Sequence, residues 1–336
     1  NKGENILAVR VRQVTNEYKI DVYDDWTLGG IYRDVVLEFM PRKRYIDKVS
    51  FKTRFDSLYK NANLDIKVMV ADRQKNTLPG NYPSPGEPYI LGFNLEDDKG
   101  RLVASEKISV PAHISTGRET ELSLRVNEPH QWNAENPYLY TLHVDLIEKE
   151  GVAHSYTEKV GFRQISTEGG IFRINGQAVK LRGVNRHDEY PTVGRATTEE
   201  NWLKDLTLMK EANINYIRLS HYAPAKGFIE LCDKIGIYVG EEVSLGGAGN
   251  MMNNPSNNGP ILQRAYETVI RDINNPSIIY WSVGNEDALT SLHIAAIKLV
   301  KALDPTRPVL LPWRAEGWLP NEVDILAPHY WKPQEY

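Results

Sequence analysis

Residues 278–284 read IIYWSVG, an apolar run that carries no charged residue. The segments on either side, ILQRAYETVIRDI at 261–273 and SLHIAAIKLVKAL at 291–303, repeat apolar residues at the spacing of an amphipathic helix. An uninterrupted apolar strand between two helices is typical of a parallel sheet that is covered on both faces. This stretch predicts a β/α fold for the second half of the chain.

The alternation of strands and helices extends in both directions from this stretch. Further strands are expected at 179–185, 214–220, 237–242, 308–311 and 323–330, and a further helix at 226–236. Thr197 and Glu200 fit a capping box at the start of another helix. The first strand leads into VNRHDEYP at 184–191, which lacks a glycine-rich phosphate loop and therefore favours a barrel over a doubly wound sheet. Six strands are expected where a closed barrel has eight, so residues 166–336 are predicted to be a partial TIM barrel with strands 1–6.

The first half of the chain has a different pattern. Up to about residue 165 it consists of short alternating runs, such as KVSFKTRF at 48–55 and YTLHVDLIE at 140–148, separated by turn residues. Residues 43–165 are predicted to form an immunoglobulin-like β-sandwich. Residues 1–42 hold only two strand-like runs, ILAVRV at 6–11 and DVVLEF at 34–39, and are expected to be the C-terminal end of a jelly-roll β domain.

Composition excludes several classes of protein. The 336 residues carry a net charge of −4, which gives no basic surface for nucleic acid. No apolar run approaches the roughly 20 residues of a membrane-spanning helix. The single cysteine, Cys232, excludes an internal disulfide and is expected to be buried on a helix. No secretory segment is visible, and because a processed protein would look the same, the compartment stays open.

Polar residues cluster where the predicted parallel strands end, which is where chemistry is located in such barrels. These residues are Asn185 to Asp188 after the first strand, Arg218, Ser220 and His221 after the second, Glu241 and Glu242 after the third, Asn285 and Glu286 after the fourth, and His329, Tyr330 and Trp331 after the sixth. Carboxylates, imidazoles and aromatic rings on one rim suit a ligand with many hydroxyl groups. Trp281, inside the fourth strand, is expected to pack between sheet and helices.

The pair Asn285–Glu286 suits the cleavage of a glycosidic bond. A glutamic acid against apolar walls has a raised pKa and can donate a proton at neutral pH. Glycoside hydrolysis requires such an acid and a second carboxylate opposite it, and a neighbouring amide can bind the sugar 2-hydroxyl.

These residues resemble glycoside hydrolase family 2, and within it the β-galactosidase branch. The motifs that carry the resemblance are GENILAVRV and DDWTLGGIYRDVVL in the first 40 residues, EPHQWNAENPYLYTLHVDL and KVGFRQI in the sandwich, and INGQAVKLRGVNRHDEYP, MKEANINYIRLSHYAP, LCDKIGIYVGEEV, INNPSIIYWSVGNED, LDPTRPV and VDILAPHYW in the barrel. The resemblance implies a jelly roll, an immunoglobulin-like sandwich and a TIM barrel in that order.

The resemblance also implies a retaining exo-β-glycosidase that acts on terminal β-galactosides. No cofactor is expected. Glu286 is the implied acid/base. The implied substrate-binding residues are Asn285, His187, His221, His329, Trp331 and Asp24, with Asp25 as the alternative to Asp24. The nucleophile of the family lies on a seventh strand, which would fall beyond Tyr336. We therefore expect these residues to be an internal part of a longer enzyme and to be inactive alone.

The sequence departs from the family at a metal site. Metal-containing members carry a glutamate and a histidine just beyond the third strand, where this chain has Gly246 and Ala248. Because magnesium requires several hard oxygen ligands, no magnesium is expected here. Glu242 is retained and is expected to hydrogen-bond His221 or to support the rim.

Several alternatives remain open at this stage. β-Glucuronidase and β-mannosidase are sister activities of the same family, and a non-catalytic carbohydrate-binding fragment is a third possibility. Retention of both Asn285 and Glu286 argues against a fragment that only binds sugar. The sequence leaves the linkage and homo-oligomer formation open.

Overall fold

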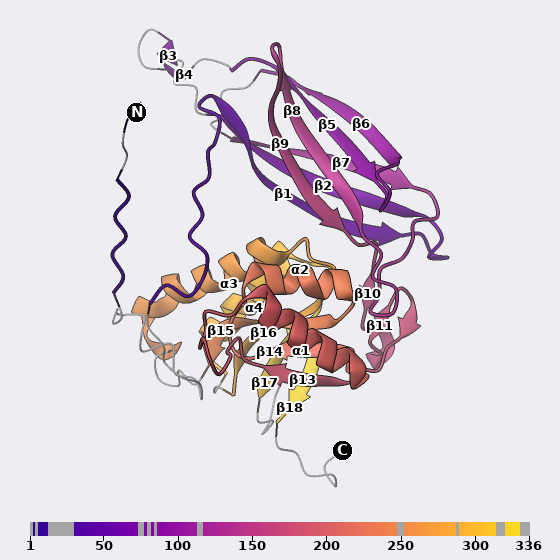
Figure 1. Cartoon of the computed structure of the whole chain (residues 1–336), viewed down its shortest axis with the longest axis vertical. Coiled ribbons are helices and arrows are strands. Elements are labelled where there is room, and N and C mark those ends of the chain that lie inside the picture. The colour runs from indigo at the N-terminus through magenta and orange to yellow at the C-terminus, as the bar shows by residue number, and fades with distance from the viewer. Residues whose placement is uncertain are drawn as a thin grey trace.

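A computed structural model describes residues 3, 6–12, 30–72, 77–78, 82–83, 86–112, 117–246, 252–286, 289–313 and 320–329. Figure 1 shows a β-sandwich and, below it in this view, a β/α unit in which helices cover a parallel sheet. The predicted order, sandwich before barrel, is confirmed.

The sandwich consists of two antiparallel sheets with strand orders β1-β2-β7 and β6-β5-β8-β9. The first sheet contains β1 (Arg44–Phe55), β2 (Ala62–Asp72) and β7 (Gly117–Val126); the second contains β5 (Tyr89–Glu96), β6 (Leu102–Val110), β8 (Tyr140–Glu148) and β9 (Gly151–Val160). Every second residue is buried in β2, and in β8 from Tyr140 to Leu146, as expected where one face of each strand lines a shared core. Leu64 and Val68 pack in the same cluster as Leu142 and Leu146.

Short strands complete this half of the chain. A two-stranded sheet pairs β3 (Thr77–Leu78) with β4 (Tyr82–Pro83). A small antiparallel sheet of β10 (Ile165–Ser166), β11 (Arg173–Ile174) and β12 (Gln177–Ala178) links the sandwich to the β/α unit.

The β/α unit is a curled half-barrel, as expected for part of a TIM barrel. Its six parallel strands lie in sequence order: β13 (Gly183–Arg186), β14 (Tyr216–Leu219), β15 (Tyr238–Gly246), β16 (Ile278–Asn285), β17 (Val309–Trp313) and β18 (Ile325–Pro328). Its helices are α1 (Glu199–Glu211), α2 (Lys226–Ile235), α3 (Asn258–Asp272) and α4 (Ser291–Leu303). Two single-turn 3-10 helices, Glu168–Gly170 and Pro255–Asn257, complete the elements of the described residues.

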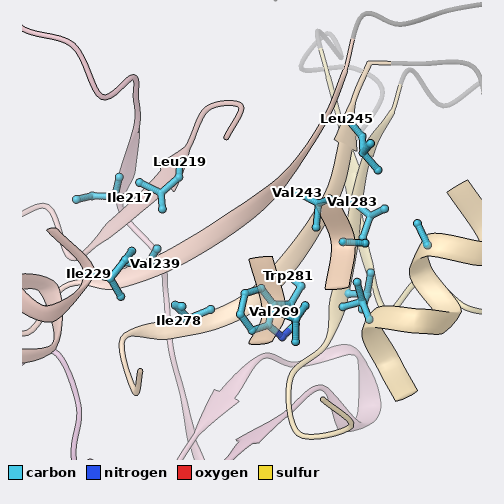
Figure 2. Packing of buried hydrophobic residues seen from close by; sticks show 14 of the residues in the cluster. Ile217, Leu219, Ile229, Val239, Val243, Leu245, Val269, Ile278, Trp281 and Val283 are labelled. Carbon is cyan, nitrogen blue, oxygen red and sulfur yellow. The ribbon is translucent and has the colours of Figure 1, made fainter. Parts of the chain in front are cut away.

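The two faces of the sheet have different partners. Trp281 and Val283 of β16 point towards the helices and pack with Val269 of α3, as Figure 2 shows. Trp281 is fully buried, and its indole nitrogen donates to Asp304 at 2.8 Å, which confirms the prediction for this residue. Cys232 is buried on α2 as expected, and burial raises the pKa of its thiol.

Two tyrosines lie on the opposite, inner face. The hydroxyl groups of Tyr216 and Tyr280 hydrogen-bond each other. A Cβ atom at Gly183 would overlap Tyr216, and one at Gly240 would overlap Tyr280, so both rings require glycine on the neighbouring strand. The tyrosines therefore fill the inner face of the sheet before the level where their strands end at Leu219 and Asn285.

Buried hydrogen bonds join the sandwich to the half-barrel. Arg163, which follows β9, donates to the carbonyl groups of Pro276 and Ile278 at 3.0 and 2.9 Å. Arg307 donates to the same Ile278 carbonyl at 2.7 Å and pairs with Asp304. Both guanidinium groups are almost fully buried, so the start of β16 is held from both parts of the chain.

Two sequence expectations were wrong. Residues 6–11 and 34–39 form no strand. Neither segment has a partner strand in the described part of the chain, and an extended segment without a partner gains no ladder of hydrogen bonds. The cap of α1 is Thr198 with Asn201, one residue later than expected. Thr197 instead donates its hydroxyl to Asp188 at 2.8 Å, and that stronger, charge-assisted acceptor removes it from the cap. None of the described helices is long and apolar enough to cross a membrane.

The buried Asp233 gives a prediction about pH. Burial raises its pKa to about 7, although Ser277 and Asn275 donate to it at 2.8 and 2.6 Å and oppose the shift. The folded state therefore favours the protonated form, so this group's contribution to stability is greatest below the ordinary carboxyl pKa and is lost as pH rises to about 7. Between pH 5 and 8, the Asp233 carboxyl should make the free energy of unfolding of the unmodified protein fall as pH rises. In Asp233→Asn we expect this fall to be smaller by about a few kcal/mol, which is the size that a pKa shift of this magnitude gives. Urea denaturation of both proteins at several pH values measures the difference. Identical pH dependence in both proteins would contradict this assignment.

Candidate active site

The parallel register places four polar side chains on one face at the carboxyl end of the sheet. Arg218 of β14 lies beside Gly240, and Glu242 of β15 lies beside Ser282 of β16. Because side chains alternate along a strand, Glu241 and Trp281 face the helices while Glu242 and Ser282 face inwards. Asn285, the last residue of β16, would face the helices by the same alternation, but it follows Gly284 with its positive φ, and its side chain reaches Arg218 on the inner face.

Glu242 is the centre of this row. Its side chain is fully buried and accepts hydrogen bonds from Arg218 at 2.6 Å, His221 at 2.7 Å and Ser282 at 2.9 Å. Three donors, one of them a guanidinium, allow a carboxylate to remain without contact with water. The hydrogen bond to His221 is the one expected from the sequence. Glu242 therefore orients its neighbours and is closed to substrate.

Arg218 fixes the orientation of Asn285. Its Nη2 donates to Asn285 Oδ1 at 2.8 Å as well as to Glu242. A guanidinium has only donors, so the amide oxygen must face Arg218 and the amide NH₂ is left to point elsewhere. Arg218 thus leaves the NH₂ as the part of the Asn285 amide that can donate a hydrogen bond.

Glu286 is held in an unusual backbone conformation. Its φ is 54°, in the left-handed region, and it follows Gly284, whose φ is 90°. Such residues cost about 1–3 kcal/mol and cluster at functional sites. A side chain at Gly284 would also contact the carbonyl of Leu245. The turn projects Glu286 outwards, with its side chain 35% exposed.

His329, after β18, contacts the Glu286 carboxyl group. The distance from His329 Nδ1 to Glu286 Oε1 is 2.7 Å. A neutral carboxylic acid donates to this nitrogen, and an N–H donates to a carboxylate, so either protonation state of Glu286 finds a partner here. Such a contact suits a group that must alternate between acid and base.

Aromatic contacts hold together the two histidines that follow the first two parallel strands. The rings of His187 and His221 are 5.4 Å apart and nearly perpendicular, and His187 also lies 6.2 Å from the ring of Tyr222. His221 is in turn bound to Glu242. The ends of the first three strands are therefore connected through side chains.

Glu241 forms a separate buried group on the helix side. Its carboxyl lies 3.3 Å from Arg271, which also pairs with Asp272. Burial, together with the Asp272 carboxylate, raises the pKa of Glu241 well above its usual range. The two neighbouring glutamates of β15 thus have opposite environments.

The sequence-based site residues divide into three groups. The structure brings Asn285, His221 and His187 together through Arg218 and Glu242, and it places Glu286 against His329. Asp24 and Trp331 lie outside the described residues. From the sequence, Arg218 was predicted only to lie at a strand end. Its role in holding Glu242 and Asn285 depends on the pairing of its strand with the third strand, and that pairing is the signal that could have indicated the role.

The residues beyond β15 do not fit a magnesium ion. Gly246, the last residue of the strand, has no side chain, and Ala248 offers only a methyl group. Magnesium requires several hard oxygen ligands, and neither side chain supplies one in place of the glutamate and histidine of the metal-containing members. In the parts of the chain that the structure describes, no three His, Cys, Asp or Glu side chains are grouped as metal ligands.

Comparison with known proteins gives consistent matches. Residues 165–332 match the model for the TIM barrel domain of glycosyl hydrolases family 2, and residues 44–163 match a second model of the same family. A β-galactosidase of Kluyveromyces lactis is 35% identical over 340 residues, which cover 91% of this chain and 33% of that protein. A β-galactosidase of Photobacterium profundum is 33% identical over 98% of this chain and 31% of its own length. The chain spans about a third of the length of these relatives.

Solved structures agree with these matches. A β-galacturonidase of Eisenbergiella tayi has a TM-score of 0.77 and 26% identity over 90% of this chain and 52% of its own. A β-D-glucuronidase from Dictyoglomus thermophilum has a TM-score of 0.65 and 26% identity over 82% of this chain and 45% of its own. With two matches that together span sandwich and half-barrel, and a site built on the ends of the barrel strands, this chain belongs to glycoside hydrolase family 2.

Proposed function

We propose that the protein is a retaining exo-β-glycosidase that releases terminal non-reducing β-galactosyl groups, with Glu286 as its acid/base. The observation that carries this proposal is the Glu286 carboxyl, exposed on a strained turn at the end of β16 and hydrogen-bonded to His329. In the first step Glu286 donates its proton to the glycosidic oxygen as the bond to the leaving group breaks. In the second step it removes a proton from the incoming water, and His329 partners it in both states.

Asn285 binds and orients the sugar in this reaction. With its oxygen held by Arg218, its NH₂ is free to donate to the sugar 2-hydroxyl, a contact that strengthens in the transition state. His187 and His221 bind the same sugar from the ends of the first two strands, and Asp24 and Trp331 are proposed as further substrate contacts.

The nucleophile of this reaction is proposed to lie outside the 336 residues. A retaining mechanism requires a second carboxylate about 5–5.5 Å from the acid. Glu242 is buried and engaged by three donors, so it is unsuited to attack a sugar carbon. On this proposal the 336 residues alone bind sugar without cleaving it. We also propose the domain division expected from the sequence, with the end of a jelly roll at 1–42, the sandwich at 43–165 and the partial barrel at 166–336. Homo-oligomer formation is compatible with the proposal but is not required by it.

A galactoside is favoured over a uronide by the charges at the rim. Uronate recognition requires a cation that is available to the sugar carboxylate. Among the described residues at the strand ends, Arg186 is paired with Asp188 and Asp205, and Arg218 is paired with Glu242. The relatives named β-galactosidase support the same choice.

The test is a panel of nitrophenyl glycosides with the full-length protein. We expect kcat/KM for the β-galactoside to exceed that for the β-glucuronide and the β-galacturonide by about 100-fold, since pairing groups for a sugar carboxylate are absent from the described rim. It should also exceed that for the β-mannoside, whose 2-hydroxyl has the opposite configuration to the one that Asn285 is proposed to bind. NMR of the first product should show the β-anomer. Preference for a uronide or a mannoside would replace the galactosidase assignment, and no turnover of any glycoside would favour a protein that only binds sugar.

A further inference from the structure

Asp188, the residue after His187, has a buried carboxylate that collects four donors. Its side chain is 2% exposed. The donors are Arg186 Nη1 at 3.1 Å, Thr197 Oγ1 at 2.8 Å, the Ala225 backbone N–H at 3.2 Å and Arg33 Nη2 at 2.6 Å. Three of them come from the half-barrel itself. The fourth and shortest contact comes from a segment 155 residues earlier in the chain.

Arg33 belongs to residues 30–43, which Figure 1 shows in indigo running from the half-barrel up to the start of β1. Besides binding Asp188, its Nη1 donates to the backbone carbonyl of Arg195 at 2.9 Å. One guanidinium thus joins both ends of the loop 188–195, which follows the first strand. Lysine, with a single nitrogen, could not bind the two acceptors in the same fixed geometry.

Ring contacts continue from this ion pair towards the candidate site. The Arg33 guanidinium lies 4.9 Å from the centre of the Tyr32 ring, and Arg195 lies 5.8 Å from Tyr32 and 4.6 Å from Tyr222. Tyr222 also accepts a hydrogen bond from the Asp188 backbone and packs against His187. The series therefore ends on a histidine of the proposed sugar-binding site.

Charge explains why the contact is built this way. A buried carboxylate needs compensation, and Arg186 cannot supply it in full because it also binds Asp205 at 3.0 Å. Arg33 is the second cation on Asp188. Removing it leaves the carboxylate under-compensated and frees one end of the loop that directly follows His187.

We propose that Arg33 is a positioning residue for the sugar site: by clamping Asp188 and the Arg195 carbonyl, it sets the place of His187. The proposal rests on the proposed function, and it assigns the segment before the sandwich a part in the geometry of the half-barrel. A misplacement of about 1 Å can reduce a rate by about 100-fold, so the clamp has a measurable effect although Arg33 touches no substrate.

The experiment compares Arg33→Met and Arg33→Lys in the full-length protein with Arg42→Met as a matched control. Arg42 lies in the same segment, is exposed, and has no ion pair among the described residues. At a temperature where all variants are folded, kcat/KM for nitrophenyl β-galactoside should fall about 10-fold or more for Arg33→Met, less for Arg33→Lys, and not at all for Arg42→Met. Amide hydrogen exchange in residues 187–197 should be faster for Arg33→Met alone.

A double-mutant cycle shows whether Arg33 acts through His187. In a His187→Ala background, Arg33→Met should have little additional effect on kcat/KM, because the group it positions is already missing. Full additivity of the two changes would overturn the proposal, and so would unchanged hydrogen exchange in residues 187–197. If the unmodified protein cleaves no glycoside, the proposed function fails, while faster exchange would still support the clamp.

Discussion

Glu286→Gln in the full-length protein should reduce the cleavage of glycosides with poor leaving groups by about 10³-fold or more. Glutamine keeps the shape of the side chain and its contact distance to His329, but it has no proton to give to the glycosidic oxygen. Activated aryl glycosides should lose much less in the first step because their leaving groups need little protonation. The measurement is kcat/KM for a series of aryl and alkyl β-galactosides.

Azide supplies the second half of this test. Without a base, water attacks the glycosyl-enzyme intermediate slowly, whereas azide is already a nucleophile and needs no proton removed. Added azide should restore turnover of the activated substrates and yield galactosyl azide. An equal loss for every leaving group, with no gain from azide, would assign the acid/base role to another residue.

Glu242→Gln should have the second largest effect, although we propose no substrate contact for Glu242. The change removes the negative charge that compensates Arg218 and leaves a buried guanidinium without its partner. Asn285 and His221 lose their fixed positions together, and we expect kcat/KM to fall about 100-fold, equivalent to about 2.7 kcal/mol. The loss should be present well below the melting temperature, which itself falls.

The neighbouring glutamate provides a matched control. Glu241 faces the helices, and burial raises its pKa well above the usual range, which disfavours the charged form and makes an amide a close substitute. Glu241→Gln should leave kcat/KM nearly unchanged. A 2-fluoro galactoside that traps the intermediate should label a carboxylate other than Glu242 in the unmodified protein, and a labelled peptide containing Glu242 would refute its supporting role.

Much of the half-barrel could be predicted from the sequence because its signals are local. The apolar run of β16 and the periodic helices beside it fix the fold, and the position of Glu286 follows from the end of that strand. The role of Arg218 could not be read in this way, since it depends on which side chains the parallel register places opposite one another. The link between Arg33 and Asp188 was missed because no periodicity records a contact between residues so far apart.

Local signals also misled in identifiable places. Residues 6–11 and 34–39 have the alternation of strands, but alternation alone supplies no neighbouring strand. Thr197 has the right residue type for a helix cap, yet the buried Asp188 is the better acceptor for its hydroxyl. In both cases a tertiary partner, present or missing, decides the local structure.

The two arginines on the carbonyl of Ile278 have a consequence for cooperativity. If the sandwich were excised, that carbonyl and the one at Pro276 would lose the donors from Arg163, and the cut surface would expose polar backbone that water must then solvate. If the half-barrel were excised, the Arg163 side chain would leave its only described acceptors behind. We therefore expect the sandwich and the half-barrel to melt as a single unit, and a chimera that exchanges one of them between relatives to need both Arg163 and its acceptors.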